Sequence, residues 1–384
     1  MSQTKAQLVS GTTAQDLTVD NINTTSINSG QPSGKRNLII NGAMQVAQRG
    51  TSFSGTAQQY TLDRMQMNTA GNDEIAQTEQ AAVTSGGAYT SGFRKCLKII
   101  NGNQTSGAGA TDVVHLKMVL EAQDIANSGW NYTSSSSFVT LSFWIKSSVA
   151  QDFPITLRSE DGTRQVYNMT TGSLSADTWT KITKTISGNS NLQFDDNNAA
   201  GLTLFINAFV GTDYTTGGLA QNAWSAWSSA KQGDNMTSTW YTTNNATLEI
   251  TGLQLEVGST ATDFEHRSYG EELLLCQRYC FVTTQGGCGI GVGGGSNSVH
   301  RCQMNLPVVM RAAPSVTMNG ASMHTYDGSA TAQFNAFASV HSLAHAIDWE
   351  TNDSERTGGS VTAYRPVIAY IKSDSGGVIC SAEL

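Results

Sequence analysis

The sequence contains little charge, very little proline and no long apolar run. Charged residues make up 14% of the 384 positions, and only 5 positions are proline. Soluble proteins average about a quarter charged residues. No run of about 18 apolar residues exists, so the sequence offers no membrane-spanning helix. The first residues, MSQTKAQLVSG, lack the apolar core of a signal peptide. We therefore expect a protein assembled in a cytoplasm, without membrane insertion.

Basic residues are also scarce. The 22 lysines and arginines are outnumbered by 30 aspartates and glutamates, which gives a formal charge of −8. Proteins that bind nucleic acids use a basic stripe to neutralise phosphates, and this sequence has none. We expect no nucleic-acid partner.

The six cysteines do not form a zinc-binding pattern. Their spacings contain no paired Cys-x-x-Cys motifs. In a protein assembled in a cytoplasm, we expect them to be buried free thiols. They are Cys96, Cys276, Cys280, Cys288, Cys302 and Cys380.

Catalytic motifs are absent as well. The sequence has no Gly-x-Ser-x-Gly elbow and no phosphate-binding Walker loop. Glu160 and Asp161 are adjacent, so in a strand they would point to opposite faces and would not form a glycosidase pair. We expect no enzymatic activity, although two carboxylates distant in sequence could still form a glycosidase site.

The most abundant pattern is a series of short alternating runs. In Phe138 to Ile145, every second residue is apolar, which predicts a strand with one face in a core. About ten such runs, separated by Gly, Asn, Ser and Asp turns and without a long helix, predict a β-sandwich. The predicted core-facing residues of this strand are Val139, Leu141, Phe143 and Ile145.

The stretch from Leu253 to Phe281 joins two parts of the chain. Leu253, Leu255 and Val257 alternate with the polar Gln254 and Glu256, which predicts a half-buried strand. Ser268, followed three residues later by Glu271 and an apolar run, is a capping box and predicts a short helix. The glycine-rich GGCGIGVGGG at 286–295 follows, and we expect it to form a loop or turn because glycine adds chain entropy and no side-chain burial.

Four separated motifs resemble the jelly-roll, carbohydrate-binding-like domain of bacteriophage tail fibres and receptor-binding proteins. They are RNLIINGAMQVAQRGTSFSGTAQQYTLDRM at 36–65, FVTLSFWIKSS at 138–148, DTWTKITKTI at 177–186 and QLEVGSTATDFEHRSYGEELLLCQRY at 254–279. The order matches the family, and LPVVMRAAPSVT at 306–317 is similar to distal fibre modules. The resemblance implies a virion protein, a homotrimer, and a role in host adsorption.

The predicted fold is therefore all-β: a jelly-roll sandwich, a short helix, a second C-terminal β domain and an extended N-terminal arm. We place the arm at 1–35, the jelly roll at 36–267, a helical hinge at 268–285 and the C-terminal domain, the candidate receptor-binding tip, at 286–384. The arm has too few apolar residues for a core of its own. We expect it to anchor the protein to another virion protein, a tail adaptor, a nozzle or the capsid; the alternative is a plain disordered tail. The candidate anchoring residues are Leu8, Leu17, Val19, Ile22 and Ile27.

One polar, glycine-containing stretch is rich in aromatic residues and is the candidate glycan-binding site. Aromatic faces stack on sugar rings, while amides, hydroxyls and carboxylates bind sugar hydroxyls. The alternative is that these aromatics close the end of the sandwich. The candidates are Tyr214, Trp224, Trp227, Trp240 and Tyr241.

Two further clusters are candidate metal sites. Asp195, Asp196 and Asn198 supply oxygen ligands of the kind that Ca²⁺ prefers, and a solvated turn is the alternative. His341 and His345 would share a face only on a helix, and their surroundings favour strands or loops. We expect ordinary histidines there.

Together these features predict a phage tail fibre or related appendage that binds a host glycan or outer-membrane protein. A capsid-attached head fibre or decoration protein is an alternative in the same class. A glycan depolymerase is a second alternative, and a secreted cellular carbohydrate-binding protein is disfavoured because no secretion signal is visible.

Overall fold

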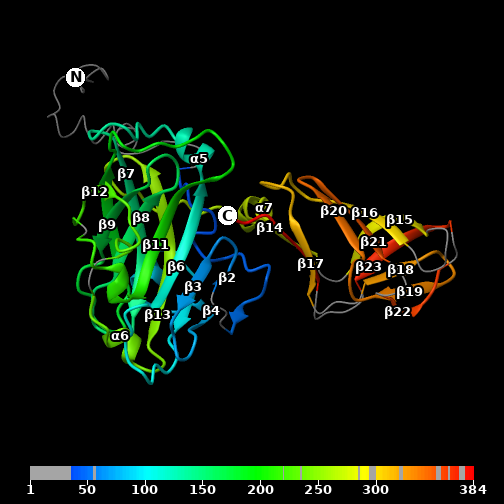
Figure 1. Ribbon diagram of the computed structural model, residues 1–384, viewed down its shortest axis with the longest axis horizontal. Coiled ribbons are helices and arrows are strands. Elements are labelled where there is room, and N and C mark those ends of the chain that lie inside the picture. Colours follow the sequence, from blue (N-terminus) through cyan, green and yellow to red (C-terminus); the bar gives the residue numbers. More distant parts are fainter. Residues whose placement is uncertain are drawn as a thin grey trace, which may run out of the picture. The chain divides into compact units, whose positions relative to one another are not determined.

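The structure is a computed structural model, and it is almost entirely β (Figure 1). It describes residues 36–54, 58–218, 220–233, 236–283, 286–293, 300–319, 323–351, 356–361, 364–371 and 377–384. The predicted anchoring arm, with Leu8, Leu17, Val19, Ile22 and Ile27, lies outside the described residues. The chain divides into two compact units. Unit 1 comprises Met1–Met44, Ser52–Gln59 and Gln66–His266, and unit 2 comprises Gln45–Thr51, Tyr60–Met65 and Arg267–Leu384.

Unit 1 is built from two antiparallel sheets. In spatial order, the six-stranded sheet contains β1 (Ser52–Phe53), β4 (Gln77–Ala82), β5 (Lys95–Ile100), β13 (Thr247–Val257), β7 (Phe138–Ser147) and β10 (Thr180–Ser187). The seven-stranded sheet contains β12 (Trp224–Ala226), β9 (Gln165–Thr170), β8 (Pro154–Ser159), β11 (Ala200–Val210), β6 (Val113–Glu121), β3 (Gln66–Ala70) and β2 (Gln58–Tyr60). Short helical segments connect the strands: α4 (Gly86–Thr90), α5 (Ala122–Ala126), η1 (Thr212–Tyr214) and α6 (Thr239–Thr242).

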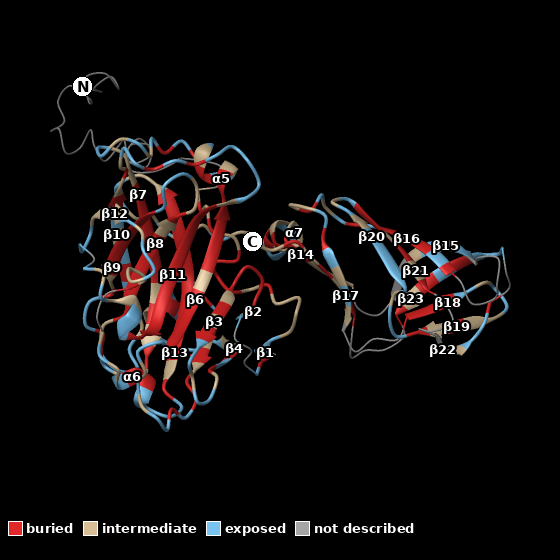
Figure 2. Ribbon diagram, in the orientation of Figure 1, coloured by how far each residue is buried: buried red, intermediate tan, exposed pale blue. Residues whose placement is uncertain are grey.

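The core of unit 1 is formed by its long strands β6, β7, β11 and β13, whose residues are mostly buried (Figure 2). The predicted core-facing side chains of β7 are each at most 1% exposed: Val139, Leu141, Phe143 and Ile145. The all-β prediction is confirmed, and the alternation in the sequence assigns the buried face of β7 correctly.

The prediction that β13 is half-buried is wrong. Gln254 and Glu256, expected at the surface, are 0% and 1% exposed. The Glu256 carboxylate accepts hydrogen bonds from the Thr262 amide at 2.8 Å, the Thr262 hydroxyl at 2.6 Å and the Gln254 amide at 2.9 Å. The segment that follows β13 therefore covers its polar face and satisfies the buried carboxylate.

Helix α7 (Tyr269–Gln277) begins at the capping box that the sequence predicts. The Ser268 hydroxyl accepts from the Glu271 amide at 3.3 Å, and the Glu271 carboxylate accepts from the Ser268 amide at 3.0 Å. The Ser268 hydroxyl also donates to the Glu271 carboxylate at 2.8 Å. This bond, followed by the bond from the Ser268 backbone amide, lowers the pKa of Glu271. The reciprocal bonds satisfy backbone donors that would otherwise lack a partner at the helix start.

Unit 2 contains two sheets. The three-stranded sheet has the order β14 (Cys280–Thr283), β24 (Gly377–Ser381) and β17 (Ser315–Asn319). The eight-stranded sheet has the order β20 (Ser339–Leu343), β21 (Ala346–Thr351), β16 (His300–Asn305), β15 (Gly286–Gly293), β23 (Pro366–Ile371), β18 (Met323–Tyr326), β19 (Thr331–Phe334) and β22 (Arg356–Gly359).

Two early segments of the chain belong to unit 2, which sequence reasoning does not foresee. Arg49 and Arg64, from these segments, both bind the Glu383 carboxylate. The Arg64 guanidinium also lies 3.5 Å from the ring centre of Tyr279. Because the side chains of Arg64 and Glu383 are only 3% and 4% exposed, loss of one partner would leave an uncompensated buried charge.

The expectation that the glycine run forms a loop or turn is wrong for its described part. Residues 286–293 form β15, which pairs with β16 on one side and β23 on the other. A Cβ at Gly289 would lie 2.6 Å from the Trp349 ring, and one at Gly291 would lie 1.9 Å from the Arg301 carbonyl oxygen. Glycine is needed here because neighbouring groups approach the backbone closely.

None of the helices in the described part of the chain is both long and apolar enough to span a membrane.

Candidate functional site

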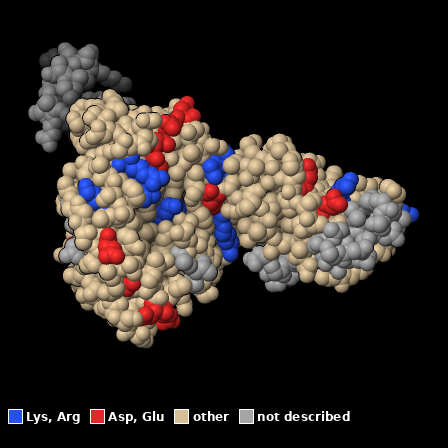
Figure 3. Space-filling model, in the orientation of Figure 1, with Lys and Arg blue, Asp and Glu red and all other residues tan. Residues whose placement is uncertain are grey.

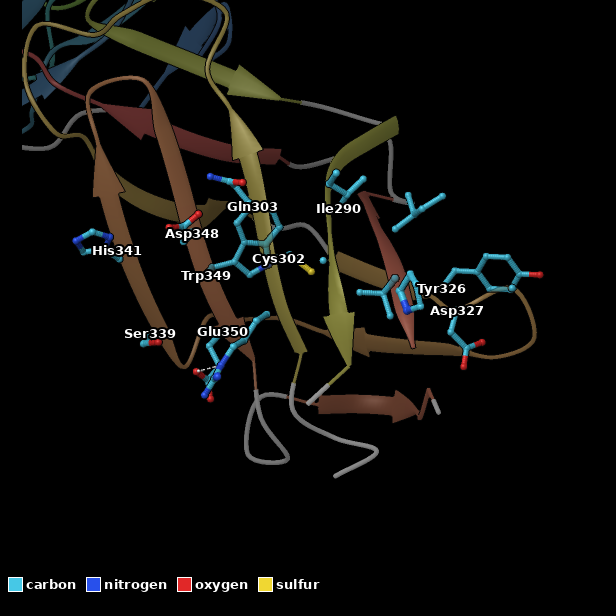
Figure 4. Close-up of a pocket in the computed structure, with 16 residues that line it drawn as sticks. Ile290, Cys302, Gln303, Tyr326, Asp327, Ser339, His341, Asp348, Trp349 and Glu350 are labelled. Atoms are coloured by element: carbon cyan, nitrogen blue, oxygen red, sulfur yellow. Dashed lines mark hydrogen bonds and ion pairs between the residues drawn. The ribbon is translucent and has the colours of Figure 1, made fainter. Parts of the chain in front are cut away.

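A groove lies on one face of the eight-stranded sheet of unit 2 (Figure 4). Its volume is about 1010 Å³, at the upper end of the range of ligand sites. Opposed residues of paired strands share a sheet face, so the strand registers place two rows of side chains in and beside the groove. One row is His341, Asp348, Gln303, Ile290, Ile368 and Tyr326. The next is Ser339, Glu350, Arg301, Val292 and Pro366.

The half of the groove formed by β15, β23 and β18 is mostly apolar, with Asp327 as its one carboxylate among the described residues. Ile290 is 72% exposed, Ile368 54%, Val292 43% and Tyr326 40%. Because glycine alternates with Ile290 and Val292 in β15, these two side chains lie on the same face of the sheet, the face that carries the groove. Contiguous exposed apolar surface on a folded protein marks an interaction site.

The half formed by β16, β21 and β20 carries hydrogen-bonding groups. The Arg301 Nε donates to the Glu350 carboxylate at 3.1 Å, and this exposed ion pair lies at the groove wall. Gln303, Asp348 and His341 follow one another across three strands, and Figure 4 shows them along the same side. An amphipathic ligand would meet aliphatic and aromatic surface on one side and donors and acceptors on the other.

The described residues of the groove contain no cluster of side chains that could hold a metal ion. Among the described residues, no three His, Cys, Asp or Glu side chains lie close enough together to hold an ion. His341 lies on β20 and His345 between β20 and β21, both exposed, so they do not share a helical face.

Two of the five predicted glycan-binding aromatics have no exposed surface. Trp240 and Tyr241, on α6, are both 0% exposed. The Trp240 indole donates to the Thr247 carbonyl oxygen at 3.0 Å, and the Tyr241 ring stacks on Phe209 with centres 4.2 Å apart. Neither ring offers a face to a sugar, because both close the core of the sandwich.

The other three aromatics are half-buried. Trp224 packs edge-to-face on Tyr167, and its indole donates to the Ser187 carbonyl oxygen at 2.7 Å. The Tyr214 carbonyl oxygen accepts from the Gln232 amide at 2.9 Å, which ties the two ends of the loop together. Trp227 lies near the guanidinium groups of Arg158 and Arg164. Of the three, only Trp227 combines partial exposure with nearby cations.

The candidate calcium cluster is exposed and its carboxylates already have amide partners. Asp195 accepts from the Gln193 amide at 3.0 Å, and Asp196 accepts from the Asn127 amide at 2.8 Å. Asn198 is also exposed. Amide N–H groups directed at these oxygens fit a hydrogen-bonded turn better than a Ca²⁺ site, which needs six or more converging oxygens.

The comparisons with known proteins give structural likeness only. No family model matches the sequence, and no curated protein matches it.

Among solved structures, the enzymatically active domain of tailspike protein 4 from bacteriophage CBA120 matches with a TM-score of 0.32 and 8% identity. The match covers 59% of this chain and 22% of that one, so the chain spans about a fifth of its length. A putative sugar binding protein from Bacteroides thetaiotaomicron matches with a TM-score of 0.30 and 12% identity, over 58% of this chain and 99% of that one. A tandem of family 22 carbohydrate-binding modules from Paenibacillus barcinonensis matches with a TM-score of 0.29 and 11% identity, over 93% and 99%.

Sequence reasoning missed the groove residues. Ile290 and Val292 lie in a glycine-rich run for which the sequence predicts a loop or turn, and no motif of the sequence singles out Asp348 or Gln303. The available signal was the strict alternation of glycine with large aliphatic residues, which predicts a strand with one bare face.

Proposed function

We propose that this protein is an adhesin of a phage particle that binds a host surface glycan in the groove of unit 2 and cleaves no bond. The observation that carries the proposal is the groove itself, about 1010 Å³, with one apolar half and one hydrogen-bonding half. Sugar rings have the same division, because their C–H faces pack on apolar side chains while their hydroxyls need donors and acceptors. The four sequence motifs that resemble tail fibres support the phage setting.

Attachment and oligomeric state complete the proposal. We place the protein on the virion as a tail fibre, with the arm at 1–35 docked on a tail adaptor or nozzle; a capsid-attached head fibre is the alternative. A homotrimer would present three grooves, and multivalent contact would raise the avidity of weak individual sites.

The test is binding to immobilised bacterial surface polysaccharides. Tyr326→Ala removes an exposed aromatic side chain from the groove, and Asp348→Asn removes a carboxylate. Asp348→Asn is expected to lose about tenfold or more in affinity, since one charged hydrogen bond is worth about 1.5–3 kcal/mol. Tyr326→Ala is expected to lose a similar amount, because burying a large apolar side chain contributes about 1.5–3 kcal/mol. Tyr89→Ala is the matched control, because Tyr89 is 38% exposed and lies in unit 1. Undiminished binding by both groove variants would reject the groove as the receptor site.

A second candidate function follows from two carboxylates on the groove face. Asp348 and Glu350 are two residues apart on β21, which corresponds to about 6.8 Å along a strand. Inverting glycosidases separate their carboxyl groups by about 6.5–9.5 Å. The ion pair with Arg301 favours a binding role for Glu350. New reducing ends after incubation with a bound polysaccharide would establish a depolymerase instead.

A further inference from the structure

The outer face of the seven-stranded sheet in unit 1 carries an unusual concentration of positive charge. Figure 3 shows Lys and Arg side chains gathered over the part of unit 1 where β8, β11 and β6 lie. The cations are Lys117 on β6, Arg158 on β8, and Arg164 and Lys231 beside them. This patch is positive although the whole chain has a formal charge of −8, so its charge differs in sign from that of the molecule as a whole.

A single carboxylate neutralises only part of this charge. Glu160 binds Arg158 at 2.8 Å and Arg164 at 3.1 Å, and it accepts from the Thr203 hydroxyl at 2.6 Å. The side-chain ammonium groups of Lys117 and Lys231 make no hydrogen bond or ion pair with the described residues, although the Lys231 backbone amide donates to the Ser228 carbonyl oxygen at 2.9 Å. Burial lowers the pKa of Lys117, and the neighbouring Arg158 lowers it further, although Glu160 raises it in part. The face therefore carries more cations than anions.

Aromatic rings lie among the cations. The Arg158 guanidinium lies 5.1 Å from the ring centre of Phe205 and 5.4 Å from that of Trp227, and Arg164 lies 5.8 Å from Trp227. Phe205 is opposite Lys117 in the pairing of β11 with β6. Ring surface beside unneutralised cations suits a ligand that has both apolar C–H groups and negative charge.

Buried polar atoms without partners face the same place. His115 and Asn207 are 6% and 1% exposed and line a small cavity with Phe205, Trp227 and Lys231. The His115 Nε2 lies 3.1 Å from the Asn68 amide nitrogen, so in the neutral ring Nδ1 carries the proton. Neither that Nδ1 nor the Asn207 Oδ1 has a hydrogen-bond partner among the described residues. The cavity volume is about 10 Å³, room for about one water, so a ligand would bind at its rim beside Lys117.

We infer that this face is a second binding site, for a saccharide that carries a carboxylate or phosphate group. Its anionic group would pair with Lys117 and Lys231, and its ring would pack on the half-buried Trp227, which lies beside the buried Phe205. The site lies in unit 1 and does not depend on the groove proposed above. The groove presents three carboxylates, Asp327, Asp348 and Glu350, so the two sites would select ligands of different charge.

The test compares polymers that share one backbone. The full chain is passed over immobilised dextran, carboxymethyl-dextran and phosphorylated dextran at low salt. Retention on one or both anionic forms, but not on neutral dextran, is expected, and the stronger form identifies the preferred group. Salt should weaken retention, because exposed ionic contacts are screened. Equal retention on neutral dextran, or none on any polymer, would overturn the inference.

Matched variants locate the site. Lys117→Gln should weaken retention about tenfold, as expected for loss of one charge-assisted contact, whereas Lys117→Arg should retain most of it. Lys184→Gln is the control, because Lys184 is a half-buried lysine on β10 in the other sheet. Should Lys117→Gln unfold the protein, Lys231→Gln serves instead. Undiminished retention by a folded variant would reject the site, and equal competition by polyacrylate would reject the saccharide component.

Discussion

The Asn37 amide nitrogen donates to the Leu253 carbonyl oxygen at 2.9 Å, which joins residues 216 positions apart in the chain. The Asn37 side-chain oxygen accepts from the backbone amides of Ile39 at 2.9 Å and Leu255 at 3.1 Å. One buried side chain therefore holds the first described turn of unit 1 against its last strand.

Asn37→Ala is expected to destabilise unit 1 by about 2–4 kcal/mol, because three buried backbone groups lose their partner. Urea denaturation followed by tryptophan fluorescence measures the change. The exposed Asn191, changed to Ala, is the control and should have little effect. A loss below about 0.5 kcal/mol for Asn37→Ala would contradict the role of this contact.

Replacement of Trp240 and of Trp227 by alanine should reduce stability by different amounts, because only Trp240 is fully buried in the core. Trp240→Ala removes a fully buried side chain and should cost about 3–5 kcal/mol of stability. Trp227→Ala should cost about 1–2 kcal/mol, since it mainly loses cation–π contacts with two arginines. The same denaturation assay compares both variants. Equal losses would show that Trp227 belongs to the core.

His115 should make unit 1 sensitive to acid. Burial lowers the pKa of His115 to about 3, with Lys117 and Arg158 adding to the effect. The folded state keeps the ring neutral while the unfolded chain, with an ordinary pKa near 6.5, binds a proton. This stability contribution is therefore complete above pH 6.5 and decreases as the pH falls toward about 3, by at most about 1.4 kcal/mol per pH unit.

Denaturation at pH 7, 6 and 5 checks this dependence. His115→Gln should remove the part of the slope due to this ring, whereas His345→Gln, at an exposed histidine, should leave it unchanged. An identical slope in the wild type and in His115→Gln would show that His115 does not set it.

Five of the six cysteines should resist alkylation. They are buried and free, as the sequence predicted: Cys96, Cys276, Cys280, Cys302 and Cys380. Burial raises the pKa of Cys380 to about 12, and it also raises those of Cys96, Cys276 and Cys280. Since the thiolate is the reactive form, iodoacetamide at pH 8 should modify them at least about 100-fold more slowly than in the urea-unfolded chain. Peptide mass spectrometry measures each site, and rapid native labelling would contradict this burial.

Local sequence patterns predicted those features of the fold that depend on neighbouring residues. The apolar alternation of β7 and the Ser268 capping box are of this kind, because period and hydrogen-bond reach determine them. The burial of Gln254 and Glu256 could not be predicted in this way. It depends on Thr262 returning to the strand after a turn.

The groove escaped prediction for a related reason. Ile290, Gln303, Asp348 and Ile368 come from four strands, and only the pairing register brings them to one face. The aromatic-rich stretch misled because polarity around Trp240 and Tyr241 suggested a surface loop, whereas α6 directs both rings into the core.

The most direct test of the receptor groove is hydrogen exchange of the full chain with and without a purified neutral host-surface glycan. At a glycan concentration near the dissociation constant, the glycan is expected to slow amide exchange in β15, β16, β21 and β23, and Tyr326→Ala is expected to weaken this protection about tenfold in apparent affinity. Protection of other strands alone, or undiminished protection in Tyr326→Ala, would contradict a glycan site in this groove.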